Sequence, residues 1–336
     1  MAKSAKLKVI LTTDIGLTPR EIFFKNLRRY FSKNGWLLLL ILPGLIHILM
    51  IQYAPMFGII IAFKNYRNAD GIFGSKWVGL DNFKFLVASG TAWHITYNTV
   101  LMNSLFILTG TAAALILALL LNEIYASKLA QVYQFTLFIP FFIGSVIVGY
   151  IAYAILSNNG FIDYLLKTHG QQIISFYMNP EDWRVILVIA NLWVGIGFGT
   201  IIYLSGIIAI NPEFFEAAQL DGANKLQQIW GITLPLVRYL VVIQVLLAIG
   251  RIFTANFGLF YFVPQVWKNG GLLSTVDVID TFVYRALYGG SLTGATGIVS
   301  LGMAAAAGFY QSVVGLALIV GANMLVRKIS PEHALF

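Results

Sequence analysis

Long apolar stretches separated by short polar segments make up most of this chain. Six of them are long enough to cross a hydrocarbon core of about 30 Å, which takes about 20 helical residues. They lie near residues 36–62, 98–121, 131–156, 185–208, 238–262 and 300–326. These runs are continuous, whereas the strands of a membrane barrel alternate apolar and polar residues. The pattern therefore predicts an all-α, polytopic membrane protein with about six transmembrane helices.

The composition agrees with a membrane protein. Of 336 residues, 58% are apolar and 11% are charged, and the mean hydropathy is +0.79. Soluble domains carry about 25% charged residues, so most of this chain is not expected to face water. The chain contains no cysteine, which excludes disulfides, thiolate metal sites and a cysteine nucleophile.

Basic residues predict the orientation. Those before the first span outnumber the acidic Asp14 and Glu21, and they are Lys3, Lys6, Lys8, Arg20, Lys25, Arg28, Arg29 and Lys33. Such an excess marks the cytoplasmic side, so six crossings place both termini in the cytoplasm. Segments 122–130 and 209–237 would then be cytoplasmic, and segments 63–97, 157–184 and 263–299 external. The basic residues are dispersed at span ends, which does not favour nucleic-acid binding.

Three parts follow along the chain: a basic cytoplasmic leader (1–35), a transmembrane domain (36–326) and a cytoplasmic tail (327–336). In the leader, Thr18, Pro19 and Glu21 form a capping-box pattern with proline at the first helical position. Apolar residues then recur at helical spacing, which favours an amphipathic helix on the membrane surface. The leader is otherwise explained as a basic topology anchor alone.

Catalytic chemistry leaves little trace in the sequence. Neither a zinc-binding His-Glu-x-x-His helix nor a Gly-x-Ser-x-Gly elbow occurs. The four histidines, His47, His94, His169 and His333, are scattered and give no ligand spacing. We therefore expect no catalytic residue, no metal site and no cofactor in this chain.

The polar segment 209–237 is predicted to form a helix-turn-helix on the cytoplasmic side. Asn211 is a good N-cap, and Pro212 fits the first helical position. Gly222 allows a turn, and a second short helix can follow before Pro235 marks the entry to the fifth span. Periodicity alone leaves two interpretations open: a segment that docks into a groove of a partner protein, or an ordinary amphipathic surface loop.

This segment also resembles the EAA signature of ABC importer permeases. Glu216-Ala217-Ala218 is followed by Gly222, by Ile232 ten residues later, and by Leu234-Pro235. The resemblance implies the type I ABC importer permease fold, with residues 209–237 forming coupling helices that dock on a cytoplasmic ATPase subunit. The docking residues it implies are Phe214, Phe215, Glu216, Ala217, Ala218, Asp221, Gly222, Leu234 and Pro235.

Other segments resemble narrower groups of that family. Residues 77–83 are similar to a segment of maltose-type sugar permeases, and residues 277–285 and 311–316 resemble the subgroup for complex oligosaccharides and polysaccharides. The resemblance extends from about Phe31 over nearly the whole chain. The run Ala304–Ala307 departs from it, because bulkier residues are expected there, and it leaves the pore-lining residues of the sixth span unassigned.

The resemblance implies a set of partners in the bacterial cytoplasmic (inner) membrane. They are a second homologous permease, two ATPase subunits that bind ATP and magnesium, and an external substrate-binding protein. This chain would not be an enzyme, and would form half of the translocation path for an oligosaccharide or polysaccharide. ATP binding would move the coupling helices and switch the permease pair between inward-facing and outward-facing states.

Polar side chains within the predicted spans are candidates for lining that path. Arg251 lies near the middle of the fifth span, where an arginine costs about 2.5–3.5 kcal/mol unless it faces the bundle interior or a wet cavity. The candidates are Asn191, Gln244, Arg251, Asn256, Gln311 and Ser312, with the aromatic residues Phe257 and Tyr261. Arg251 is otherwise explained by a structural bond between helices, and the aromatic residues by an interfacial belt.

Three alternatives to sugar import remain open. The first is an ABC permease for another solute. An ion-coupled secondary transporter needs carboxylates within the membrane, and the predicted spans hold no central Asp or Glu. A membrane-embedded glycosyltransferase or hydrolase needs clustered carboxylates, for which Asp277 and Asp280 form only a lone pair.

Overall fold

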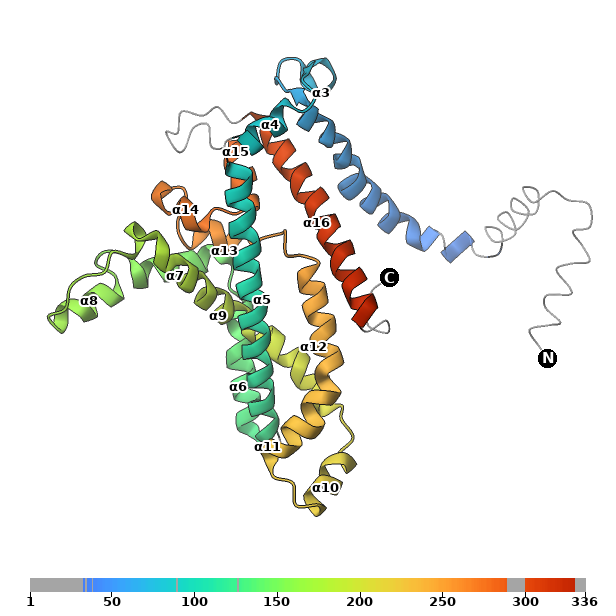
Figure 1. The fold of residues 1–336 in the computed structure, drawn as a ribbon, viewed down its shortest axis with the longest axis vertical. Helices are drawn as coiled ribbons and strands as arrows, with labels where there is room; N and C mark the ends of the chain where they lie inside the picture. The colour runs from blue at the N-terminus through green and yellow to red at the C-terminus, as the bar shows by residue number, and fades with distance from the viewer. Residues whose placement is uncertain are drawn as a thin grey trace, which may run out of the picture. The chain divides into compact units, whose positions relative to one another are not determined.

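The computed structural model describes residues 33, 35–37, 39–88, 90–125, 127–288 and 300–329 (Figure 1). The chain divides into two compact units, Met1–Ile59 and Ile60–Phe336. The predicted amphipathic helix of the leader and the last residues of the predicted tail lie outside the described residues.

The first unit is helical from Gly35 onward, and no charged residue occurs before the end of that helical run at Phe63. A π turn, η1 (Leu49–Tyr53), interrupts it and leads into the 3-10 helix η2 (Ala54–Phe63). The π turn ends two residues before Pro55, which has no N–H to donate and whose ring crowds the carbonyl four residues earlier. Widening the helix ahead of the proline relieves that conflict.

A short hairpin opens the second unit. Strands β1 (Lys64–Asn65) and β2 (Lys76–Trp77) pair antiparallel, with α3 (Gly71–Gly74) between them and α4 (Asp81–Ala88) after them. The buried Asn82 side chain donates to Ala62 O at 2.8 Å and to Lys64 O at 3.1 Å. A Cβ on Gly302 would lie 2.6 Å from Lys64 O, so the last helix begins against this hairpin.

Two long helices, α5 (Thr91–Glu123) and α9 (Trp183–Ile208), pack along each other and form the centre of the second unit. Small residues allow close approach, because a Cβ on Gly199 would lie 3.0 Å from that of Ala114. A Cβ on Gly197 would lie 2.1 Å from Leu137 O of α6 (Lys128–Phe138), so α6 also packs closely on α9.

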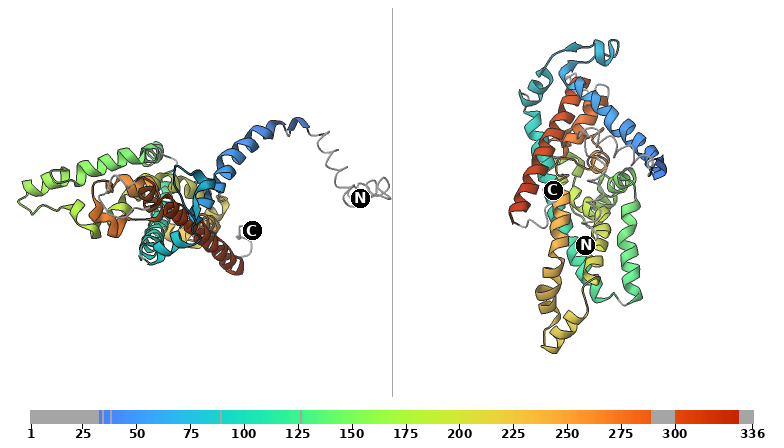
Figure 2. Two further views of the ribbon diagram at one scale, coloured as in Figure 1. Left: turned by 90° about the horizontal axis from the view of Figure 1, so that it is seen from above. Right: turned by 90° about the vertical axis from the view of Figure 1, so that its right-hand side faces the viewer.

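The remaining helices complete two ends of this bundle. Those on the α4 side are α7 (Ser145–Leu156), α8 (Phe161–Thr168), η4 (Phe176–Met178), η5 (Pro180–Asp182), α13 (Phe257–Phe262), η7 (Gly270–Leu272), α14 (Leu273–Val276) and α15 (Ile279–Tyr288). A core around Trp183, Leu187 and Phe260 joins α5, α7, α9, α13 and α14. At the opposite end lie α10 (Glu213–Leu220) and α11 (Lys225–Gln228), as Figures 1 and 2 show.

The last helix, α16 (Leu301–Ile329), packs against α4, α12 (Leu234–Ile249) and α15. Ala304, Ala306 and Ala307 are buried there. The alanine run, where bulkier residues were expected, thus forms the close packing surface of α16.

Six helices of the described chain are long and apolar enough to span a membrane, which confirms the predicted all-α polytopic class. They are Gly35–Phe63, Thr91–Glu123, Ser145–Thr168, Pro180–Ile208, Lys225–Ile249 and Leu301–Lys328. Four agree with the predicted spans to within several residues at each end, whereas the third and the fifth predicted spans were wrong as continuous helices.

The predicted third span, 131–156, is divided by the 3-10 turn η3 (Ile139–Phe142) and the extended Gly144. Pro140 removes a helical hydrogen-bond donor at this place. The spanning candidate begins only at Ser145 and continues through α8. The apolar pattern could not locate the interruption, because apolar residues continue on both sides of it.

The predicted fifth span, 238–262, is displaced and broken. The helical run begins at Lys225, passes through the π turn η6 (Ile229–Thr233) into α12, and ends at Ile249. Residues 250–256 are not helical. Asn256 then caps α13 by accepting a bond from Leu259 N at 3.2 Å.

Candidate functional site

The hairpin made by α10 and α11 is defined by local hydrogen bonds. Asn211 Oδ1 accepts from Glu213 N at 3.1 Å at the start of α10. At its end, Ala223 N donates to Ala218 O at 2.8 Å and Gly222 N to Gln219 O at 3.0 Å, which is a Schellman motif. Gly222 has φ +79°, a conformation that glycine adopts without strain. The predicted cap and turn are therefore present.

The second half of the hairpin begins with a capping box. Asn224 Oδ1 accepts from Gln227 N at 2.9 Å, and Gln227 Oε1 accepts from Asn224 N at 2.7 Å. The helix then continues through η6 into α12 without a stop, so Pro235 lies inside a helical run. As at Pro55, the π turn ends two residues before the proline.

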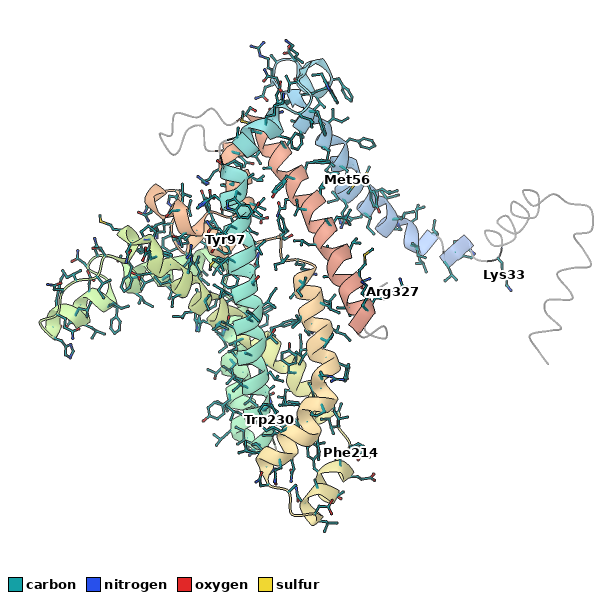
Figure 3. All side chains as sticks on the ribbon, in the orientation of Figure 1. Lys33, Met56, Tyr97, Phe214, Trp230 and Arg327 are labelled. Atoms are coloured by element: carbon teal, nitrogen blue, oxygen red, sulfur yellow. The ribbon has the colours of Figure 1, made fainter. Side chains whose placement is uncertain are left out.

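Apolar side chains are exposed on this hairpin. Leu220 is 91% exposed, Trp230 72%, Leu226 67% and Phe214 55%. Figure 3 labels Phe214 and Trp230, which both lie at the α10 end of the bundle. Phe214 and Leu220 lie outside the candidate membrane spans, whereas Leu226 and Trp230 lie within the candidate Lys225–Ile249, so exposure indicates an interaction surface only for the first two.

The residues predicted for docking divide by exposure. The exposed ones are Phe214, Glu216, Ala217, Asp221, Gly222 and Pro235, and the half-buried ones are Phe215, Ala218 and Leu234. Phe215 lines a groove of about 370 Å³ between the hairpin and the ends of α5 and α9, so its side chain faces the bundle. Lys225 adds an ion pair with Glu123 of α5 at 3.2 Å. The docking assignment of these residues stays a prediction.

A second candidate site is a cavity of about 570 Å³ lined by α5, α9, α12 and the non-helical residues 250–256 that follow α12. We refer to residues 250–256 as the break. Its polar lining residues are Asn103, Thr111, Asn191, Tyr203, Gln244, Arg251, Thr254 and Asn256. Arg251 is the charged residue of this lining. Phe106 and Phe198 add aromatic surface. Four of the predicted path residues, Asn191, Gln244, Arg251 and Asn256, are thus brought together.

The sequence predicts Arg251 in the middle of the fifth spanning helix, but the structure places it outside a helix. It follows the end of α12, and its N–H donates to Ala248 O at 3.0 Å in the turn that begins the break. Its side chain is exposed on the cavity. Backbone that is not helical at membrane depth is tolerated where it lines a cavity or is buried in protein, and this segment does both.

The other four predicted path residues lie away from the cavity. Phe257 stacks on Tyr261 with ring centroids 5.0 Å apart, and both contact Tyr284 of α15. Gln311 Nε2 donates to Phe253 O at 2.7 Å, and Ser312 Oγ donates to Gly308 O at 3.0 Å within α16. These contacts hold the fold together, and a path role for these four residues stays a prediction.

Two residues that sequence reasoning did not assign prove informative. Asn103 lines the cavity from α5, and its only sequence signal is that it is an amide in an apolar span. Asp280 was weighed only as half of a carboxylate pair with Asp277. The structure separates the two, since Asp277 pairs with Arg285 and accepts from Thr281, whereas Asp280 accepts from Ala255 N at 2.7 Å. This division does not suit the paired carboxylates of a glycosidase.

Burial raises the pKa of Asp280 above its ordinary range. Hydrogen bonds from Ala255 N and from Gln311 stabilise the carboxylate and oppose that shift.

This chain is similar in sequence and in structure to transport proteins of bacteria. The family model "Binding-protein-dependent transport system inner membrane component" matches residues 107–331. The chain is 35% identical over 310 residues to the "Polygalacturonan/rhamnogalacturonan transport system permease protein YteP" of Bacillus subtilis, covering 92% of each chain.

Two solved chains share the fold. One comes from the crystal structure of "a bacterial ABC transporter involved in the import of the acidic polysaccharide alginate", with a TM-score of 0.79 and 31% identity over 91% of this chain and 99% of that chain. The other comes from the "bacterial alginate ABC transporter in complex with alginate pentasaccharide-bound periplasmic protein", with a TM-score of 0.78 and 30% identity over 90% of this chain and 97% of that chain.

The helical bundle with its projecting hairpin is thus the transmembrane part of an ABC importer. This chain belongs to the family of binding-protein-dependent transport system inner membrane components. The predicted family and permease fold are confirmed, and the chain is a multi-pass membrane protein.

Proposed function

We propose that this chain is one permease subunit of an ABC importer for an acidic oligosaccharide. It pairs with a second homologous permease in the bacterial cytoplasmic (inner) membrane, with both termini in the cytoplasm. Two ATPase subunits bind ATP and magnesium and hydrolyse the ATP, and an external binding protein delivers the cargo. The observation that carries the cargo proposal is the cavity in which amides and hydroxyls surround one arginine.

The hairpin supports docking on the ATPase subunits. It projects beyond the ends of α5 and α9, and its tip combines exposed Phe214 and Leu220 with the negative charges of Glu216 and Asp221. An apolar helix seated in a groove gives affinity, and the charges fix its orientation. The Lys225–Glu123 ion pair joins the hairpin to α5, which gives movement of the hairpin a direct connection to the bundle.

The cavity supports a carbohydrate cargo. Sugars present hydroxyls that bond to amides, and apolar ring faces that pack on aromatic side chains. The amides come from α5, α9, α12 and the break, so they surround the cavity from several sides. The relative from Bacillus subtilis is named for polygalacturonan and rhamnogalacturonan, and the solved neighbours for alginate, which supports a polysaccharide-derived cargo.

Arg251 supports an acidic cargo. The residues that line the cavity include no Asp, Glu or Lys to pair with it or to compensate its charge. A charge-assisted bond to a carboxylate contributes about 1.5–3 kcal/mol, which is more than a neutral hydrogen bond contributes. A uronate residue in the cargo would supply that carboxylate. An ion-coupled transporter is less well supported, because such a mechanism needs a carboxylate in the path.

The test is ATP-driven uptake by the complete complex in proteoliposomes, with its binding protein. An oligogalacturonate and a maltooligosaccharide of equal length are the two cargoes. Arg251→Gln should reduce uptake of the acidic cargo about ten-fold or more, the loss of one charge-assisted bond. Arg238→Gln removes an exposed charge from α12, away from the cavity, and is the matched control.

Two results would overturn the proposal. Uptake that does not require ATP would exclude an ABC importer. Equal loss of both cargoes in Arg251→Gln, together with a lower thermal midpoint of the complex, would show that Arg251 has a structural role and does not recognise a carboxylate.

A further inference from the structure

The break between α12 and α13 leaves backbone groups without helical partners. A helix end exposes carbonyls that the next turn would have bonded, and in a membrane protein such groups need partners within the protein. The break still turns on itself twice, through Ile252 N to Ile249 O at 3.0 Å and Thr254 N to Arg251 O at 2.8 Å. Other groups of the segment are bonded from outside it.

Three side chains from three different helices supply these bonds. Asn103 Nδ2 of α5 donates to Ile252 O at 2.8 Å, and Gln311 Nε2 of α16 donates to Phe253 O at 2.7 Å. Asp280 Oδ2 of α15 accepts from Ala255 N at 2.7 Å. Gln311 also donates to the Asp280 carboxylate, at 3.2 and 3.3 Å to its two oxygens, so these two residues act as one unit.

The exposure of the segment alternates accordingly. Phe253 and Ala255, whose backbone groups are held by Gln311 and Asp280, are buried, while Arg251, Thr254 and Asn256 are exposed and line the cavity. The bonds to the buried side fix which side chains face the cavity.

Asp280 is itself held firmly. Ile279 N donates to Thr99 Oγ1 of α5 at 3.1 Å, and Thr281 Oγ1 donates to Asp277 Oδ1 at 3.0 Å. Asp277, just before α15, also pairs with Arg285, eight residues later in that helix. The Asp280 carboxylate therefore belongs to a helix whose position is fixed by its bond to α5. A side chain on a fixed helix can hold the break accurately.

We infer that Asp280, together with Gln311, is a positioning residue of the translocation path. It holds the break in the conformation that presents Arg251, Thr254 and Asn256 to the cavity, although it does not line the cavity itself. The consequence for transport rests on the proposed function, whereas the conformation can be tested without any cargo.

The test uses single cysteines, because the chain has none of its own. Thr254→Cys is on the exposed side of the break, Ala255→Cys on the buried side, and Ile107→Cys lines the same cavity from α5. Thiol labelling rates are measured in the purified full complex, with Asp280 intact and in the Asp280→Leu background. With Asp280 intact, position 254 should label much faster than position 255.

In Asp280→Leu we expect the ratio of the rates at 254 and 255 to fall about ten-fold, because Ala255 N loses its charged acceptor. The rate at position 107 should stay the same. Asp280→Asn retains one acceptor oxygen and should give an intermediate ratio. An unchanged ratio in Asp280→Leu overturns the inference, and so does a rise in labelling at all three positions, which would indicate general loosening of the bundle.

Discussion

The α10–α11 hairpin and the break after α12 are both interruptions between helices, but their shapes are specified differently. The hydrogen bonds that shape the hairpin turn and its caps join residues at most five positions apart, as in the Ala223–Ala218 bond and the capping box of Asn224. The bonds that hold the break reach Asp280, Gln311 and Asn103, which lie 25, 58 and 149 positions from their partners. The hairpin can therefore form from local sequence alone, whereas the break requires the packed bundle.

This contrast suits the two proposed tasks. A hairpin defined by its own caps can move as one body against a partner subunit without losing its shape. A break defined by three other helices changes when those helices move, so the side chains it presents to the cavity respond to the state of the bundle. Coupling to the ATPase would then depend on bonds between neighbouring residues, and contact with the cargo on bonds between distant helices.

The largest expected effect comes from the local element. Gly222→Val places a β-branched residue at φ +79°, which costs about 1–2 kcal/mol. The cost is backbone strain alone, because nothing lies within 4 Å of a Cβ built there. ATP-driven uptake should fall about ten-fold, while Gly222→Asn, which tolerates this conformation, should retain most of it. Normal uptake by the valine variant would contradict the role of the turn.

A middle-sized effect is expected in the non-local element. Asn103→Leu leaves Ile252 O without its donor, at a cost of about 1–3 kcal/mol of folding free energy. Thr109→Val on the same helix removes only a hydroxyl that bonds within α5, to Leu105 O at 2.7 Å, and should change little. The measurement is the thermal midpoint of the purified complex. Equal shifts in the two variants would mean that the Asn103 bond does not stabilise the break.

The same contrast explains what could be predicted from the sequence. The turn at Gly222 and the side-chain bond of Asn211 could be predicted, because both act through neighbours in the chain, whereas the predicted helix entry at Pro235 was wrong, since Pro235 lies inside a helical run. The break was missed, because apolar residues continue on both sides of Gly250 and the partners that stabilise a non-helical course are far away in sequence. The sequence also does not show whether a proline ends a helix. Pro140 does, whereas Pro235 is accommodated within a helical run by a π turn.

The candidate path was predicted only in part for a related reason. Polarity within a span identified Asn191, Gln244, Arg251 and Asn256, but it could not distinguish a side chain that faces the cavity from one that bonds a neighbouring helix. Gln311 is of the second kind. Asn103 faces the cavity and also bonds the break, and only the packing of α5 reveals this.

The smallest expected effect is a pH dependence of stability from Asp280. Its pKa in the folded protein is raised, chiefly by burial, so the folded state binds the proton more readily than the unfolded state does. The stabilisation is therefore greatest at low pH and is lost as the pH rises through the raised pKa. The thermal midpoint of the unmodified complex should rise relative to that of Asp280→Asn between neutral and mildly acidic pH. A difference that stays constant or reverses would contradict this sign.

Crosslinking can show whether the exposed α10–α11 hairpin binds the ATPase subunits. Leu220 is 91% exposed at the hairpin tip, and Phe73 is 90% exposed near α3 at the other end of the second unit. Two variants are made, Leu220→Cys and Phe73→Cys, and in each the new cysteine is the only one in the chain. A short photocrosslinker is then attached to its thiol in the assembled complex.

We expect the crosslinker at Leu220→Cys to join this chain to the ATPase subunit, and the crosslinker at Phe73→Cys not to do so. Docking through the hairpin would be contradicted if an actively transporting complex gave no ATPase crosslink from Leu220→Cys, or if Phe73→Cys gave an equal yield.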